Sequence, residues 1–192
     1  MNLIAAVDNK WRIGFNGKLL YHCPADMKNF KELTTQNLSG TGQNVVIMGS
    51  KTLLSFPKGE PLPNRYNIVL SFNENLRNKY KDKDNIVFVS NCDMAMGIAH
   101  EVAEDDNIWI VGGGSIYLQF FRKCKKAYIT RFFDDYVKTH DINKLTTKIA
   151  YMPELSKENW SIADYSPVFK NEADGILYQY QLLYNNDFLQ VK

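Results

Sequence analysis

Asp26 is the side chain in this sequence whose type and position are best suited to binding a ligand. Pro24 favours the first position of a helix, so Asp26 falls in the first helical turn, where the helix dipole stabilises a carboxylate by about 0.3–1 kcal/mol. That is a sufficient structural reason for an acid. Met27 and Phe30 nevertheless place Asp26 beside an apolar stripe, where a partly buried carboxylate needs donors. A cationic or amide-bearing ligand would supply them, so these residues alone leave both roles equally open.

A glycine-rich turn, Val-Gly-Gly-Gly-Ser at 111–115, joins an apolar run to an amphipathic stretch. Its glycines would let the backbone approach a ligand, and a following helix N-terminus offers free N–H groups to phosphate. A tight turn is the alternative, although one glycine would suffice for it. The dinucleotide fingerprint needs a third glycine where Tyr117 stands, so it fails. The turn therefore predicts a phosphate or nucleotide without naming a fold.

A second possible anion site follows the apolar run at 45–48, where Lys51 and Thr52 are predicted to open a helix. The phosphate loop of nucleoside triphosphatases is excluded. The Gly-Lys pair at 17–18 is followed by Leu19, and no glycine stands five residues before that pair's glycine.

The composition narrows the class of protein. Apolar residues make up 45% of the 192 residues and charged residues 23%, which excludes global disorder. A net charge of +2 gives no broad positive field for nucleic acid, and no apolar stretch reaches the roughly 18 residues that span a bilayer. The three cysteines and three histidines are scattered, so neither a disulfide framework nor a zinc site is indicated. We expect one cytoplasmic domain that holds no metal and binds neither nucleic acid nor membranes.

Short apolar runs alternate with amphipathic stretches, which predicts an α/β layer fold with a largely parallel sheet. The runs, rich in β-branched and aromatic residues, are 3–7, 45–48, 67–70, 86–89, 108–111 and 127–132. Helices are predicted over 24–33, around 94–102 and over 115–121, and Asn91 or Asp93 is expected to cap the second.

The C-terminal part is predicted to form an antiparallel hairpin at one sheet edge. Residues 160–165 and 176–184 have strand patterns, and the loop between them ends in Asp-Gly at 174–175. The pattern over 134–152 is weak and polar, which predicts a surface loop, and 185–192 are expected to form a flexible tail.

Taken in order, these segments resemble the dihydrofolate reductase family. The resemblance depends on the joint order and spacing of blocks that are each modest alone, and a weaker match continues through the C-terminal strands. The matching blocks are 4–8, 12–14, 24–31, 46–49, 51–52, 55–56, 61–71, 111–117 and 129–130.

The resemblance implies a single domain over 1–192, with an eight-stranded, mostly parallel mixed sheet, about four flanking helices and an antiparallel C-terminal hairpin. It also implies an oxidoreductase that acts on a CH–NH bond and reduces 7,8-dihydrofolate to 5,6,7,8-tetrahydrofolate with NADPH. Such an enzyme supplies one-carbon metabolism and thymidylate and purine synthesis. The resemblance further implies a monomer that binds antifolate-type inhibitors.

The resemblance gives Asp26 the role of pairing with the pterin's ring N–H and amino group, with Thr130 bracing the carboxylate. The field of this acid would favour the protonated substrate, with water carrying the proton. Tyr21 stands where the family usually has Trp, so its hydroxyl is expected to rebuild a water-mediated pterin contact. Leu19 belongs to the segment 9–23, which resembles the mobile loop over the nicotinamide.

The resemblance also implies the remaining contacts. Arg65 resembles the family's clamp for the substrate's α-carboxylate, which suits a planar guanidinium. Other substrate contacts are expected from Ile4, Ala5, Met27, Phe30, Lys31, Phe56, Leu62, Val111 and Tyr117. Cofactor contacts are expected from Ala6, Ile13, Gly14, Gly17, Lys18, Leu19, Gly49, Ser50, Lys51, Thr52, Ser55, Leu70, Ser71, Phe72, Val111, Gly112, Gly113, Gly114, Ser115, Ile116 and Tyr117, with a cis bond between Gly112 and Gly113.

Two further functions stay open from the residues. One is a reductase of the same architecture that acts on a ribosyl-aminopyrimidine, although Asp26 and Arg65 favour folate. The other is a non-catalytic nucleotide-binding module, which is suggested by Tyr21 and by Lys138, since the family carries an acid where Lys138 stands. Ser50 and Ser115 stand where many members carry Arg, which leaves 2′-phosphate recognition to Lys51.

Overall fold

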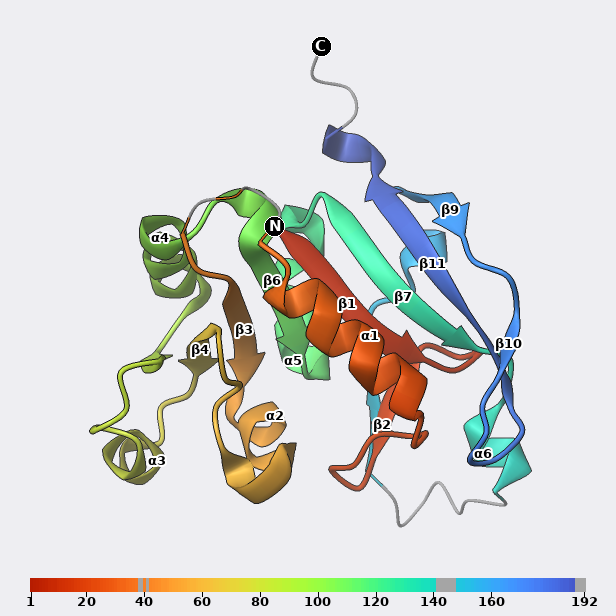
Figure 1. The fold of residues 1–192 in the computed structure, drawn as a ribbon, viewed down its shortest axis with the longest axis horizontal. Coiled ribbons are helices and arrows are strands. Elements are labelled where there is room, and N and C mark those ends of the chain that lie inside the picture. Colours follow the sequence, from red (N-terminus) through yellow and green to blue (C-terminus); the bar gives the residue numbers. More distant parts are fainter. Residues whose placement is uncertain (38–39, 41, 141–147, 189–192) are drawn as a thin grey trace.

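The computed structural model describes residues 1–37, 40, 42–140 and 148–188, and one large mixed sheet forms its centre (Figure 1). Eight strands lie in the order β10-β11-β7-β1-β6-β3-β4-β5, and β9 adds a ninth by pairing with β11. Their bounds are β1 (Asn2–Val7), β3 (Val45–Gly49), β4 (Tyr66–Leu70), β5 (Ile86–Val89), β6 (Ile108–Gly112), β7 (Lys126–Phe132), β9 (Trp160–Tyr165), β10 (Phe169–Lys170) and β11 (Leu177–Asn185). The predicted eight-stranded mixed sheet is confirmed, with β9 as an addition.

Strands β7, β1, β6, β3, β4 and β5 pair in parallel, whereas β9, β10 and β11 pair antiparallel. The parallel strands are the continuous apolar runs of the sequence; residues 45–48, for example, are fully buried. Such strands are covered on both faces, which is why their patterns do not alternate. The antiparallel C-terminal strands are confirmed, and the loop between the two longer ones contains β10.

Helices cover both faces of the sheet (Figure 1). Side chains of the first three helices join one core cluster, and side chains of α4 and α5 join the other. The helices in the described residues are α1 (Pro24–Thr35), α2 (Ser50–Ser55), α3 (Glu74–Lys79), α4 (Cys92–Val102), α5 (Gly114–Phe120) and α6 (Tyr136–Thr139). These six helices exceed the expected number of about four, because short helices such as α3 and α6 give little sequence pattern to predict them from. Of the two predicted caps, Asn91 and not Asp93 caps α4, by accepting a hydrogen bond from the Met94 backbone N–H at 2.9 Å.

The region over 134–152 contains more regular structure than the expected surface loop. Helix α6 forms there, and β8 (Ile149–Tyr151) pairs with β2 (Arg12–Phe15) in a separate two-stranded sheet. Three residues of weak pattern give no strand signal alone, and their pairing with β2 supplies the order. Residues 141–147 lie outside the described part of the chain.

The C-terminal strand also extends further than its pattern predicted. Asn185, the first residue of the expected tail, is buried and donates from Nδ2 to the Cys124 carbonyl at 3.1 Å. Residues 186–188 continue as a 3₁₀ turn, and 189–192 lie outside the described residues.

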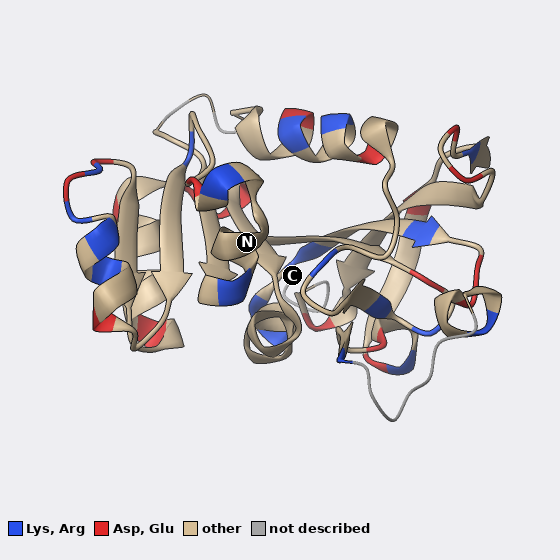
Figure 2. Cartoon of the chain, turned by 90° about the horizontal axis from the view of Figure 1, so that it is seen from below, with Lys and Arg blue, Asp and Glu red and all other residues tan. Residues whose placement is uncertain are grey.

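Neither the distribution of charge nor the hydropathy of the helices is strongly uneven. Acidic and basic residues are interspersed over the elements (Figure 2). Among the described residues, no helix has the length and apolar character needed to cross a bilayer.

Candidate active site

Asp26 and Thr130 meet at the start of α1. Pro24 is the first residue of that helix and Asp26 lies in its first turn, as the sequence predicted. Thr130 lies on β7, opposite Ala6 of β1, and its hydroxyl donates to Asp26 Oδ1 at 2.5 Å. The expected contact between the acid and its brace is therefore present.

The environment of Asp26 favours its neutral form more than water would. Burial raises the pKa of Asp26, and the hydrogen bond from Thr130 opposes that rise in part. Among the described residues, Thr130 is the donor found for this carboxylate. An ionised carboxylate has about four lone-pair sites, so Asp26 retains acceptor capacity for N–H groups of a ligand.

An apolar wall adjoins this acid. Five residues expected to line the substrate slot come from separate segments and share one core cluster: Ile4, Phe30, Phe56, Leu62 and Val111. Tyr117 lies behind them, and its hydroxyl donates to the carbonyl of Ile4 at 2.7 Å. The wall therefore consists of β1, β6, α1 and the segment after α2, held from behind by α5.

The opening beside Asp26 joins α1 to the segment that follows β2. A small pocket there is lined by Ala6, Ile13, Leu19, Leu20, Tyr21, Cys23, Asp26 and Met27. Leu19 and Met27 are 62% and 50% exposed, as befits side chains at a rim. The pocket thus unites the predicted cofactor contacts Ala6 and Ile13 with Asp26, the predicted pterin partner.

Tyr21 makes a contact that the sequence did not predict. Its ring is buried and stacks on Phe132 with centroids 4.2 Å apart, and its hydroxyl donates to Asp134 Oδ2 at 3.0 Å. The expected water-mediated contact of this hydroxyl with the pterin stays a prediction: the hydroxyl donates to Asp134, which the segment after β7 brings within reach, and Tyr21 also lines the pocket beside Asp26.

Arg65 is buried, and its guanidinium plane is fixed from two sides. Nε donates to the Pro63 carbonyl at 3.0 Å, and one terminal nitrogen donates to Thr34 Oγ1 at 2.8 Å. Burial lowers the pKa of Arg65. Thr34, on α1, was not predicted as a site residue. It could have been recognised as a polar residue four positions after Phe30, on the side of the helix that was predicted to be buried.

The glycine turn fits a ligand approaching its backbone. The bond between Gly112 and Gly113 is cis, as expected, and Gly112 has a φ of +105°. A Cβ on Gly112 would lie 2.9 Å from the ring of Tyr117, and one on Gly113 would lie 3.5 Å from Thr52 Oγ1. The structure thus brings the two predicted anion sites, the starts of α2 and α5, side by side. Unpaired N–H groups at these helix starts suit a pyrophosphate.

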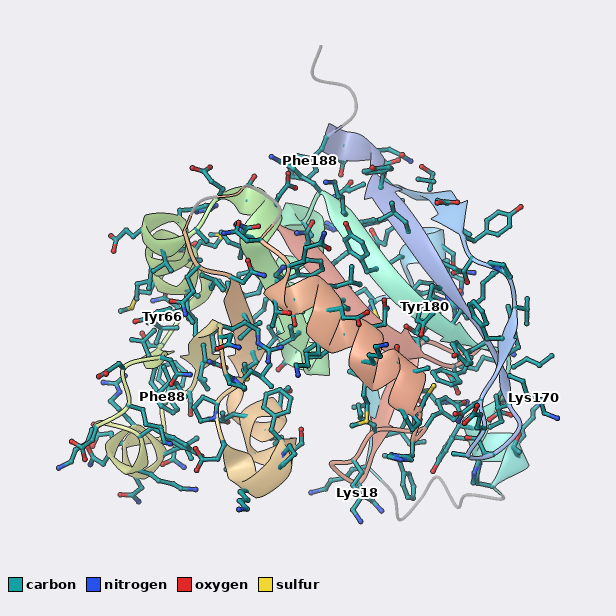
Figure 3. The ribbon with its side chains drawn as sticks, viewed as in Figure 1. Lys18, Tyr66, Phe88, Lys170, Tyr180 and Phe188 are labelled. Carbon is teal, nitrogen blue, oxygen red and sulfur yellow. The ribbon has the colours of Figure 1, made fainter. Side chains whose placement is uncertain are left out.

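The other expected cofactor residues surround this turn on several segments. Residues 15–18 form a tight turn after β2, in which Phe15 and Lys18 share reciprocal backbone hydrogen bonds of 2.8 and 2.9 Å; Figure 3 labels Lys18. A Cβ on Gly14 would lie 2.8 Å from the Lys18 carbonyl. Lys51 is exposed, and Phe72 is 84% exposed. Among the described residues, no group of three or more His, Cys, Asp or Glu side chains is arranged to hold a metal.

An ion-pair network that the sequence did not predict supports the segment over 9–23. Arg12 contacts Asp8 Oδ2 at 2.8 Å and Asp135 Oδ1 at 2.5 Å, and Asp8 is fully buried. The network joins β2 to the residues that follow β7. Only the spacing of Asp8 and Arg12 was visible in the sequence, since Asp135 is 123 residues from Arg12.

Comparisons with known proteins agree with this geometry. The family model described as "Dihydrofolate reductase" matches residues 1–185. The dihydrofolate reductase of Drosophila melanogaster is 32% identical over 185 residues, which cover 95% of this chain and 96% of that protein. The dihydrofolate reductase of Bos taurus is 30% identical over 201 residues, covering 97% and 98%. That of Candida albicans is 35% identical over 128 residues, covering 66% and 64%. With a family match over nearly the whole sequence, this chain belongs to the dihydrofolate reductase family.

Proposed function

We propose that this protein reduces 7,8-dihydrofolate to tetrahydrofolate with NADPH as the hydride donor. One observation carries the proposal: Asp26 is held at an apolar wall by Thr130 with acceptor capacity to spare. When ionised, Asp26 would accept hydrogen bonds from the pterin's ring N–H and amino group. Its negative charge would then stabilise the protonated, electron-poor ring, with water delivering the proton.

Arg65 supports the choice of a carboxylate-bearing substrate. Its contacts with Thr34 and Pro63 fix the guanidinium plane, so that its remaining N–H groups can pair with the substrate's α-carboxylate. The apolar side chains of Phe30, Phe56 and Leu62 would hold the aromatic rings between these two charged groups and exclude water.

The glycine turn supports NADPH. Gly113 leaves room beside Thr52, and the starts of α2 and α5 would receive the pyrophosphate. Lys51, exposed at the start of α2, would pair with the 2′-phosphate. When bound, NADPH supplies the hydride; the chain's residues orient it against the pterin. We also propose that the enzyme is a monomer and binds antifolate-type inhibitors. A location in the cytoplasm is proposed as well, because its three cysteines are free thiols, which is typical of a reducing compartment.

A spectrophotometric assay tests the proposal. NADPH oxidation should require dihydrofolate and should be absent when a ribosyl-aminopyrimidine is the substrate. With dihydrofolate as substrate, oxidation of NADH should be slower than oxidation of NADPH. Faster turnover of the ribosyl-aminopyrimidine would overturn the substrate assignment. Tight NADPH binding without turnover of either substrate would instead indicate a nucleotide-binding module.

A further inference from the structure

A second cavity lies beside α1, away from the pocket next to Asp26. It has a volume of about 280 Å³, and it opens between α1 and strands β7, β9 and β11. Figure 3 labels Tyr180 in this region, beside α1. Its lining comprises Asn29, Leu33, Tyr128, Ile129, Thr130, Asp164, Tyr165, Ser166, Tyr180, Gln181 and Leu182.

The cavity has a local structural cause. Strands β9 and β11 lose regular register between Leu182 and Leu183, directly beside the positions paired with Asp164 and Tyr165. A bulge of this kind bends a strand and redirects its side chains. On the facing side, α1 presents Asn29, whose small side chain leaves the space open.

Aromatic rings form its walls. The ring of Tyr128 packs against Trp109 with centroids 5.1 Å apart, and the ring of Tyr180 contacts Tyr178 edge-on at 5.5 Å. These neighbours fix the two rings from behind, so the cavity presents preformed aromatic surfaces. Ligand sites for drug-sized molecules measure roughly 300–1,000 Å³, so this space suits a ligand of one or two rings.

The charge of the residues that line the cavity narrows the class of ligand. Among the described residues that line the cavity, Asp164 alone carries a formal charge at neutral pH, and no Lys or Arg is present. This surrounding repels anions, and aromatic faces also attract cations.

We propose that this cavity is a binding site for a small planar aromatic ammonium compound, whose ring packs among the tyrosines and whose charge pairs with Asp164. The cavity is distinct from the proposed folate site, because its lining shares no residue with the pocket beside Asp26 and includes none of the five residues of the apolar wall. Thr130, which contacts Asp26, is the point at which the two sites adjoin.

Calorimetric titration with three indoles tests the charge preference. All three share the indole ring system and differ in charge: tryptamine is a cation, tryptophol is neutral and indole-3-acetate is an anion. Tryptamine should bind with one site per chain, and indole-3-acetate at least tenfold more weakly. Asp164→Asn should weaken tryptamine about threefold to fivefold, as expected for an exposed ion pair. Asp82→Asn, an exposed acid outside the lining, is the matched control and should change nothing.

Two variants locate the site. Asn29→Trp should fill the cavity and weaken tryptamine at least tenfold, with thermal unfolding confirming that the variant is folded. Asp26→Asn should leave tryptamine binding within twofold, since the ligand does not occupy the folate site. Equal binding of indole-3-acetate and tryptamine, full binding to Asn29→Trp, or loss of binding in Asp26→Asn would each overturn the proposal.

Discussion

Two acidic side chains, Asp8 and Asp26, flank the segment over 9–23, which contributes residues to the pocket of the candidate active site, and their surroundings differ. Asp8 is fully buried and accepts from the backbone N–H groups of Lys10, Arg12 and Tyr136 at 2.8, 3.0 and 3.3 Å. The Arg12 guanidinium adds an ion pair at 2.8 Å. Asp26 receives Thr130 at 2.5 Å, its one donor within the part of the chain that the structure describes.

The difference separates a structural acid from a functional one. A buried charge is tolerated when it is paired and hydrogen-bonded, and Asp8 meets both conditions. Asp26 meets them only in part, and burial accordingly raises its pKa. A ligand with N–H groups would complete its shell, so the incomplete shell is the feature on which binding depends.

Asp26→Asn should produce the largest effect on activity. The amide keeps the shape but loses the charge, so kcat at neutral pH should fall about 10²–10³-fold, as when a preorganised electrostatic group is removed. The loss should shrink as pH falls and substrate arrives protonated. A pH profile of dihydrofolate-dependent NADPH oxidation measures this, and a constant deficit at every pH would contradict it.

The same variant should stabilise the ligand-free protein. Because the folded-state pKa of Asp26 is raised, its contribution to stability is full below about pH 3.9 and is lost as pH rises through the folded pKa. Chemical denaturation should therefore show Asp26→Asn to be more stable than the parent at pH 7, with the gap closing at low pH. If Asp26→Asn were less stable than the parent at pH 7, the claim that the charge of Asp26 destabilises the ligand-free fold, unlike that of Asp8, would be contradicted.

Asp8→Asn should do the reverse. Removing one partner of a buried ion pair leaves Arg12 incompletely compensated, so the free energy of unfolding should fall by about 3 kcal/mol. Urea denaturation at pH 7 is the measurement. Asp164→Asn, an exposed acid, is the control and should change stability by less than about 0.5 kcal/mol. A similarly small effect at Asp8 would show that its contacts do not stabilise the fold.

Arg65→Leu should sharpen the assignment of the other charged group. Loss of a charge-assisted pair costs about 1.5–3 kcal/mol, so KM for dihydrofolate should rise roughly tenfold to a hundredfold while kcat changes little. Binding of NADPH, measured by fluorescence, should stay within twofold. Equal weakening of both ligands would contradict the role of Arg65.

Thr130→Val should have a smaller effect. It removes the donor that opposes the rise in the pKa of Asp26, so that pKa should move higher still, and kcat/KM should fall about tenfold. Thr130→Ser keeps the hydroxyl and should retain both values. A valine variant with parental kinetics would show that the brace is dispensable.

Much of the site is encoded locally and was therefore predictable. Pro24 fixes the start of α1, and the apolar side chains of Phe30 and Leu33 fix its orientation and hence the position of Asp26. The glycines at 112–114 likewise identify a backbone approached closely by other groups. These features need only a few neighbouring residues to specify them.

Features that depend on distant partners were not predictable. Strand β8 is ordered by pairing with β2, and Arg12 finds Asp135 across 123 residues. The orientation of Tyr21 is set by Asp134, 113 residues away. The cavity behind α1 arises from the register shift in β11, which no local pattern marks.

Titration of the Asp26 carboxyl carbon by NMR tests the central claim most directly. In the ligand-free protein its pKa should lie above the ordinary value of about 3.9. In the complex with NADPH and folate it should be lower than in the free protein, because pterin N–H groups then complete the shell of the ionised form. An ordinary pKa in the free protein, or one that folate leaves unchanged, would contradict the account.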